Sequence, residues 1–200
     1  MMKSGKFDAF IEEVLSTRTP SSIPNRNASY LEAAVLIPIF ENNGEYKLLF
    51  TKRTDGVEHH KGQISFPGGA VDKGDATFKE TALREADEEI GLLGNDVKIL
   101  GQIDDTLTVV SRFIIHPFVG LIPHPYDFKI NSKEVKRLIK VPFNLFLEDI
   151  SMNKMDSIEF EGTTYPTPAY DYNGDLIWGA TARIMENFLD ILGEKLDLPI

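Results

Sequence analysis

The stretch GGAVDKGDATFKETALREADEEIGL, residues 68–92, joins a glycine-rich loop to a helix rich in carboxylates. Thr77 and Glu80 have the spacing of a capping box, and Gly91 is a typical helix terminator, so the sequence predicts a helix over residues 76–90. At about 100° per residue, one side of this helix is apolar and is expected to face the core: Ala82, Leu83, Ala86 and Ile90.

Three glutamates, Glu85, Glu88 and Glu89, fall in one arc on roughly the opposite side, with Arg84 beside them. An acidic surface helix is one interpretation of this pattern, and Arg84 can pair with Glu88 at i, i+4. The like-charge pair Glu85 and Glu89 costs roughly 0.2 to 0.5 kcal/mol, and anions in the last turn of a helix cost roughly 0.3 to 1 kcal/mol each. A divalent cation would relieve this repulsion, and clustered carboxylates without His or Cys suit Mg²⁺ or Mn²⁺ better than zinc.

The loop before the helix adds to this indication of a site. Gly68, Gly69 and Gly74 lie where the backbone must turn sharply and can approach a ligand closely, with Asp72 and Asp75 nearby. Turns explain most glycine-rich loops, but this loop leads directly into a helix rich in carboxylates.

Composition limits the classes of function. The chain has 200 residues, of which 42% are hydrophobic, so one domain with one core is expected. A formal net charge of −10 argues against a nucleic-acid partner, and a phosphorylated ligand would need local cations, backbone N–H groups or a metal ion. With no cysteine, thiolate catalysis, disulfides and Cys-ligated zinc are excluded. No targeting segment or membrane span is recognisable, so we expect a cytoplasmic protein.

The rest of the chain predicts a mixed sheet with helices packed on it. A helix near residues 5–17 and a connecting arm make up residues 1–30, ahead of a domain over 31–200. Strand-like runs are AAVLIPIF (33–40), KLLFTKR (47–53), ISFPGG (64–69), VKILGQID (97–104), LTVVS (107–111), FIIHPFVGLI (113–122), SIEFEG (157–162) and PAYDYNGDLIWG (168–179); further helices are expected at 141–149 and 181–192. Because strands and helices do not alternate regularly, the expected class is α/β (α+β).

The opening stretch resembles the signature of the Nudix hydrolases, which runs G, five residues, E, seven residues, then R-E-U-x-E-E-x-G-U, with U a bulky aliphatic residue. Residues 84–92 fit this pattern position by position, with Ala86 as a small aliphatic. The first half departs from it: Asp75 stands in place of the glutamate, and eight residues instead of seven separate it from Arg84. This departure puts Asp75 in doubt as a functional equivalent.

The same spacing is typical of the Nudix subgroup that cleaves coenzyme A, which also has an arginine on a strand followed by H-x-G-Q-I-x-F-P-G-G. Here LLFTKRTDGVEHHKGQISFPGG (48–69) supplies the matching residues, with Thr54 in place of an expected serine: Arg53, His60, Gly62, Gln63, Ile64, Phe66, Pro67, Gly68 and Gly69. The C-terminal IWGATARIMENFLDIL is also similar to that subgroup, so the resemblance covers roughly residues 33–192.

The resemblance implies an α/β/α sandwich and hydrolysis of coenzyme A or acyl-coenzyme A to 3′,5′-ADP and (acyl-)4′-phosphopantetheine. It implies that Glu85, Glu88 and Glu89 ligate Mg²⁺ or Mn²⁺ and that Arg84 orients these glutamates. Glu89 or Glu88 is the candidate general base, and Glu134 is a weaker one. The candidate substrate-binding residues are Arg53, His60, Gly68 and Gly69, with Lys52 and Lys61 as further local cations.

Other functions stay open at this stage. A Nudix pyrophosphatase acting on ADP-ribose, dinucleotides or (d)NTPs would carry the same catalytic helix. A noncatalytic nucleotide-binding Nudix domain is the alternative outside the enzymes. His60 either contacts substrate or caps its loop through a hydrogen bond. Whether the chain forms a homodimer is also left open.

Overall fold

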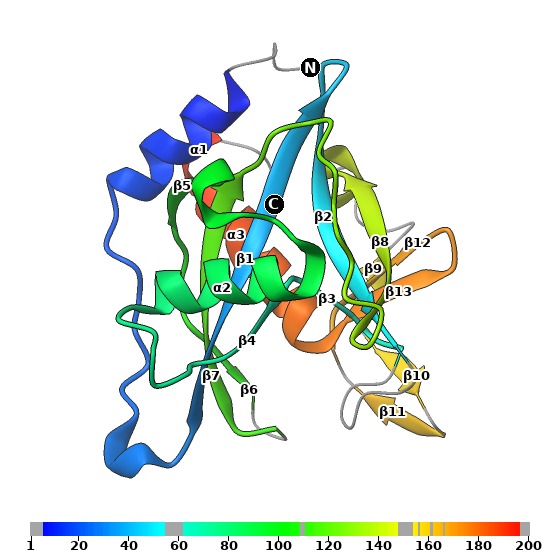
Figure 1. Cartoon of the computed structure of the whole chain (residues 1–200). Coiled ribbons are helices and arrows are strands. Elements are labelled where there is room, and N and C mark those ends of the chain that lie inside the picture. Colours follow the sequence, from blue (N-terminus) through cyan, green and yellow to red (C-terminus); the bar gives the residue numbers. More distant parts are fainter. Residues whose placement is uncertain are drawn as a thin grey trace.

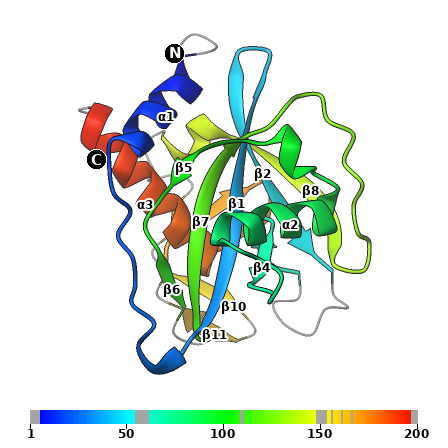
Figure 2. The ribbon, with the colours of Figure 1, turned by 60° about the vertical axis from the view of Figure 1, so that its left-hand side comes forward.

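The computed structural model describes residues 6–54, 62–108, 111–147, 154–155, 157–160, 162–165 and 167–196. A mixed β-sheet forms the middle layer, and helices cover both of its faces (Figures 1 and 2). The α-helices of this part are α1 (Phe7–Ser16), α2 (Phe78–Ile90) and α3 (Gly179–Leu196), and the 3-10 turns are η1 (Arg26–Ala28), η2 (Gly94–Asp96) and η3 (Phe143–Phe146). The expected mixed α/β/α architecture is therefore confirmed.

The central sheet has the strand order β3-β2-β1-β7-β5, and the short strand β4 pairs with β1, β6 with β7 and β8 with β2. Its strands are β1 (Leu31–Asn42), β2 (Glu45–Arg53), β3 (Ile64–Ser65), β4 (Gly68–Ala70), β5 (Lys98–Gln102), β6 (Thr106–Thr108), β7 (Phe113–Leu121) and β8 (Val135–Pro142). The predicted hairpin is present, with Ile39 opposite Leu48, while β1 runs parallel to β7. Because β1 lies in the middle and is covered on both faces, it reads as a nearly continuous apolar run.

Two hydrophobic clusters lie on the two faces of this sheet. Helices α1 and α3 pack on one face, and α1 contributes its apolar stripe there: Phe7, Ile11, Val14 and Leu15. Helix α2 covers the other face through Ala82, Ala86 and Ile90. Figure 2 shows α1 and α3 together on one side of the sheet and α2 on the other. Leu83, expected on the core side, is only half-buried, because it lies at the margin of α2 against the turn at Gly94.

Residues after the central sheet form two small sheets, one from β10 (Ile158–Phe160) and β11 (Thr163–Tyr165), the other from β9 (Lys154–Met155), β12 (Ala169–Tyr172) and β13 (Asp175–Trp178). The predicted Asn-Gly turn connects β12 to β13. None of the helices in the described ranges is both long and apolar enough to cross a membrane.

One strand was missed, and one expected helix was wrong. Strand β8 was not predicted, because its exposed basic residues, Lys136, Arg137 and Lys140, interrupt the apolar pattern of the segment. The helix expected over 141–149 is a 3-10 turn, η3, and its first residues belong to β8. Residues 109–110 of the expected strand over 107–111, and 148–149 of that helix, lie outside the described part.

Candidate active site

The loop and helix of residues 68–92 meet beside the central sheet. Helix α2 starts at Phe78, and the Thr77 side chain accepts a hydrogen bond from the backbone N–H of Glu80, as the capping pattern predicts. The helix ends at Gly91, whose φ of 65° is the left-handed conformation that favours glycine. Strand β4 pairs with β1 in the opposite direction and so holds Gly68 and Gly69 against α2.

Both glycines are required by close contacts, but the contacts differ. A Cβ on Gly69 would lie 2.5 Å from Cδ of Glu85 and 2.6 Å from each of its carboxylate oxygens. A Cβ on Gly68 would lie 2.4 Å from the backbone oxygen of Ala34, and Gly68 has a φ of 156°. Gly69 thus makes room for a carboxylate, whereas Gly68 lets the loop approach the backbone of β1.

Arg84 connects the loop to two of the glutamates. Its Nε and Nη2 donate to the two carboxylate oxygens of Asp75, each at 2.9 Å. Its Nη1 donates to Glu85 at 2.8 Å and to Glu88 at 3.1 Å, and Nη2 also donates to the backbone oxygen of Ala70. The hydrogen bonds from Arg84 hold the pKa of Asp75 well below its ordinary range.

The sequence left the role of Asp75 in doubt, and the structure places it as the bidentate partner of Arg84. The extra residue between Asp75 and Arg84 does not displace the acid, because the turn before α2 brings it back to the arginine. Thr81 also donates to the Asp75 carboxylate, at 2.9 Å. Asp75 stands at the place of the first glutamate in the Nudix signature, and this position could have indicated its role.

Glu89 is buried, with only 2% of its surface exposed, although its position in the helix predicted a more open site. Arg53 Nη1 lies 3.7 Å from its Oε1, and its buried Oε2 has no hydrogen-bond partner in the described part of the chain. Burial raises the pKa of Glu89 to about 8, against the opposing effects of Arg53 and of the Gly68 backbone N–H; the charges of Glu85 and Glu134 add to the increase. Glu89 is therefore the carboxylate with the least compensated charge.

Burial also raises the pKa of Glu85, whereas the side chain of Glu88 is 59% exposed. The structure thus brings Arg84, Glu85, Glu88, Glu89, Arg53, Gly68 and Gly69 into one region at the C-terminal half of α2. The remaining candidate, His60, lies outside the described residues, as does Lys61.

Residues 30–147 match the family model of the NUDIX domain, which is more than half of the chain. The chain belongs to the Nudix family. A protein of Yersinia pestis (strain Pestoides F) called uncharacterized Nudix hydrolase NudL is 36% identical over 163 residues, covering 80% of this chain and 79% of the relative. This relationship supports the same assignment, and the chain is a Nudix pyrophosphohydrolase.

Two solved structures are similar in fold. A MutT/nudix family protein from Enterococcus faecalis has a TM-score of 0.56 and 12% sequence identity, covering 96% of this chain and 75% of that one. A MutT protein from Methanosarcina mazei Go1 has a TM-score of 0.53 and 19% identity, covering 90% and 99%. The arrangement of the sheet and its helices is therefore the Nudix fold.

Nudix hydrolases generally use divalent metal ions, and the carboxylates of α2 are the groups of this site that would hold one. Within the described ranges, no three His, Asp or Glu side chains are arranged as a ready ion site. In this arrangement the Arg84 guanidinium donates hydrogen bonds to both Glu85 and Glu88. The donor chemistry nevertheless fits a hard cation, because the site consists of carboxylate oxygens. One of them is the buried Oε2 of Glu89, which has no hydrogen-bond partner among the described residues. An ion would compete with Arg84 for Glu85 and Glu88.

Glu134 lies at the edge of the Nudix site, immediately before β8. Its carboxylate accepts a hydrogen bond from Asn131 at 3.1 Å, and its backbone oxygen accepts one from the N–H of Thr54, just after Arg53. Its charge contributes to the raised pKa of both Glu85 and Glu89. Glu134 stays the weaker candidate base.

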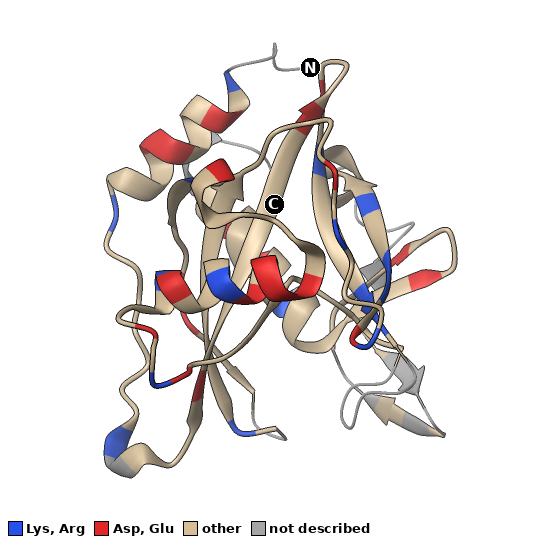
Figure 3. Cartoon of the chain, in the orientation of Figure 1, with Lys and Arg blue, Asp and Glu red and all other residues tan. Residues whose placement is uncertain are grey.

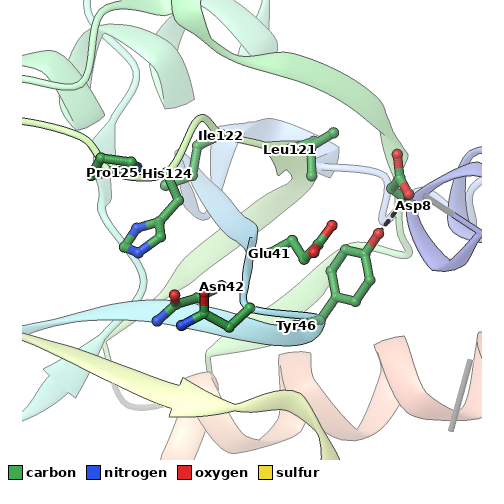
Figure 4. A pocket seen from close by; sticks show the side chains of 9 residues that line it. Asp8, Glu41, Asn42, Tyr46, Leu121, Ile122, His124 and Pro125 are labelled. Carbon is green, nitrogen blue, oxygen red and sulfur yellow. Dashed lines mark hydrogen bonds between the residues drawn. The ribbon is translucent and has the colours of Figure 1, made fainter. Parts of the chain in front are cut away.

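A pocket of about 710 Å³ lies elsewhere, at the turn between β1 and β2 (Figure 4). Glu41, Tyr46 and His124 line it, and the Tyr46 hydroxyl donates to Asp8 of α1 at 2.7 Å. None of the candidate catalytic residues lines this pocket. The pocket is therefore not part of the candidate Nudix site.

Proposed function

We propose that this Nudix hydrolase cleaves the pyrophosphate bond of coenzyme A or acyl-coenzyme A, with Mg²⁺ or Mn²⁺, to 3′,5′-ADP and (acyl-)4′-phosphopantetheine. The observation that carries the proposal is the contact between the two sequence elements. The coenzyme A-type element ends in Gly68 and Gly69, and Gly69 lies directly against Glu85 of the catalytic helix. Arg53, from the same element, faces Glu89. The residues of the coenzyme A-type element thus lie next to the glutamates expected to hold the metal ion.

The residues of the chain have distinct roles in this reaction. Glu85, Glu88 and Glu89 would hold the divalent cation, which when bound neutralises charge on the pyrophosphate oxygens and makes water a better nucleophile. Asp75 anchors Arg84, and Arg84 in turn orients Glu85 and Glu88.

Arg53 is proposed to bind the substrate, and nearby carboxylates to accept a proton. Arg53 presents a guanidinium to an anionic substrate that the net charge of −10 would otherwise repel. Glu89 and Glu88 are the candidates for accepting a proton from the attacking water, and Glu134 is a weaker one.

Product identification tests this function. The purified chain is incubated with Mg²⁺ or Mn²⁺ and one substrate at a time: coenzyme A, acetyl-coenzyme A, ADP-ribose, NADH or dGTP. The products are separated by chromatography and identified by mass spectrometry. We expect 3′,5′-ADP and a phosphopantetheine from the first two substrates. Cleavage of another substrate without cleavage of either coenzyme A species would reject the proposal. If no substrate is cleaved but one binds, the noncatalytic alternative is supported.

A further inference from the structure

The loop between β7 and β8 holds the C-terminal end of the catalytic helix. The last carbonyl groups of a helix have no partner within the helix, and here the loop supplies two. The backbone N–H of Asn131 donates to the backbone oxygen of Glu89, and that of Lys129 to the oxygen of Ile90, each at 2.9 Å. The contact is close, because a Cβ on Gly91 would lie 2.8 Å from Cβ of Lys129. The loop therefore fixes the turn of α2 that carries Glu89.

Asn131 begins a tight turn in this loop, and both ends of its carboxamide are used. Its backbone oxygen accepts a hydrogen bond from the N–H of Glu134 at 3.0 Å. Its Oδ1 accepts one from the N–H of Lys133 at 3.2 Å, as asparagine commonly does at the start of a turn. Its Nδ2 donates to Oε1 of Glu134 at 3.1 Å. The turn thus fixes the Asn131 carboxamide, and the carboxamide orients the Glu134 carboxylate.

Glu134 lies beside the carboxylates of α2. The next residue, Val135, packs in the hydrophobic cluster that α2 covers, and it pairs with Arg53 across β2 and β8. Acidic residues gather toward the C-terminal end of α2, the end that this loop contacts (Figure 3). The charge of Glu134 contributes to the raised pKa of both Glu85 and Glu89, so it acts on these two carboxylates directly.

Glu134 and Asp75 are held by different kinds of donor. The guanidinium of Arg84 donates to both oxygens of Asp75 and holds the pKa of that carboxyl well below its ordinary range. Asp75 is therefore a poor proton acceptor. Glu134, by contrast, accepts a hydrogen bond from the uncharged amide of Asn131. An uncharged donor directs a carboxylate without cancelling its charge, so Glu134 keeps its ability to accept a proton.

We propose that Asn131 is a positioning residue of the Nudix reaction, which keeps the Glu134 carboxylate directed toward the site so that it can accept a proton during hydrolysis. A base must lie within hydrogen-bond reach of the proton that it accepts, and the two bonds of Asn131 set the place and the direction of this carboxylate. Glu88 and Glu89 are also expected to hold a cation, and a separate carboxylate leaves their oxygens for that purpose. The inference rests on the proposed function only in needing a pyrophosphate substrate, whichever one is cleaved.

A double-mutant cycle tests whether Asn131 acts through Glu134. We measure kcat and KM at saturating Mg²⁺ for the wild type, both single variants and the double variant, on the substrate that the wild type cleaves. Glu134→Gln is expected to lower kcat by about 100-fold, as the loss of a general base does. Asn131→Ala keeps its backbone N–H, so the bond to Glu89 stays. It should lower kcat by about 10-fold with KM unchanged, as the loss of a hydrogen bond to a charged group predicts. In the Glu134→Gln background the same change should lower kcat by less than about 2-fold.

Two further variants complete the test. Asn25→Ala is the matched control, because Nδ2 of Asn25 donates to Oε1 of Glu32 at 2.7 Å, which is the same kind of bond at a carboxylate outside the site. Its kcat should equal that of the wild type. Asn131→Asp has nearly the same shape as the wild type and can still accept from the Lys133 N–H, but it cannot donate to Glu134. It should lose at least as much kcat as Asn131→Ala, and it serves if that variant does not fold.

The outcomes that contradict this role are distinct. Equal losses of kcat in the two backgrounds, a loss confined to KM, or an equal loss in Asn25→Ala would show that Asn131 only stabilises its turn. Full activity in Glu134→Gln, or in both Asn131 variants, would overturn the proposal as well. A wild type that cleaves ADP-ribose but not coenzyme A rejects the proposed substrate, and the cycle is then measured on ADP-ribose. A wild type that cleaves no pyrophosphate rejects both conclusions.

Discussion

Replacing Gly69 by alanine is expected to remove most of the activity while leaving the fold nearly as stable. The added Cβ would lie 2.5 Å from Cδ of Glu85 and 2.6 Å from both oxygens, closer than real Cβ atoms approach. The contacted atoms are the free end of a rotatable side chain, so Glu85 would move and the backbone would not. The main cost in stability is the loss of the hydrogen bond from Arg84 to Glu85, which in a partly exposed pair is worth about 1 kcal/mol.

Gly68→Ala is the matched control, because its clash is with backbone. The Cβ would lie 2.4 Å from the Ala34 oxygen, at a φ of 156° that side-chain-bearing residues rarely adopt. Backbone strain of about 1 to 3 kcal/mol and overpacking of about 1 to 3 kcal/mol add in this variant. We therefore expect Gly68→Ala to lose about 2 to 6 kcal/mol of folding free energy.

Urea unfolding and metal-dependent hydrolysis separate the two effects. Gly69→Ala should unfold within about 1 kcal/mol of the wild type and lose about 100-fold in kcat, since a displacement of about 1 Å of a catalytic group costs on that order. Full activity in Gly69→Ala would show that Glu85 need not occupy this position. A loss of stability as large as that of Gly68→Ala would show that the loop at Gly69 moves, and not the Glu85 side chain.

Further predictions concern the carboxylates of the site. Glu88→Gln and Glu89→Gln should each lower kcat by orders of magnitude with an unchanged circular dichroism spectrum, and full metal-dependent activity in both would contradict the metal assignment. Folding raises the pKa of Glu89 from 4.5 to about 8, so the folding stability of the wild type falls as the pH rises between these values. Glu89→Gln lacks this titration. With chelator present, this variant should therefore be more stable than the wild type above pH 5. At about 1.4 kcal/mol per pH unit the difference approaches about 5 kcal/mol near pH 8, and urea titrations at pH 5 and pH 8 that show no growing difference would refute it. Asp75→Asn should weaken Mg²⁺ or Mn²⁺ binding measured by calorimetry, because Arg84 loses its bidentate anchor and competes more for Glu85 and Glu88; unchanged affinity would argue against this role.

The sequence determined the local features of the Nudix helix. Thr77 and Gly91 mark its ends, because capping depends on residues within one turn, and the predicted bounds differ from α2 by only two residues at the start. The placement of Ala82, Ala86 and Ile90 on the core side likewise follows from helical periodicity. The family signature could be recognised because its residues are close together in the chain.

Only the tertiary structure decided how the charges of the site are balanced. Glu89 shares an arc of α2 with the exposed Glu88, and it is buried because β4 and Arg53 of β2 lie over it. Periodicity tells which side chains share a face, but not which of them another segment covers. Lys52, Arg137 and Asp175 come together for the same reason, from three strands far apart in sequence, and β8 was not even predicted as a strand. Charge pairing between distant segments depends on packing, so the local pattern of the sequence cannot specify it.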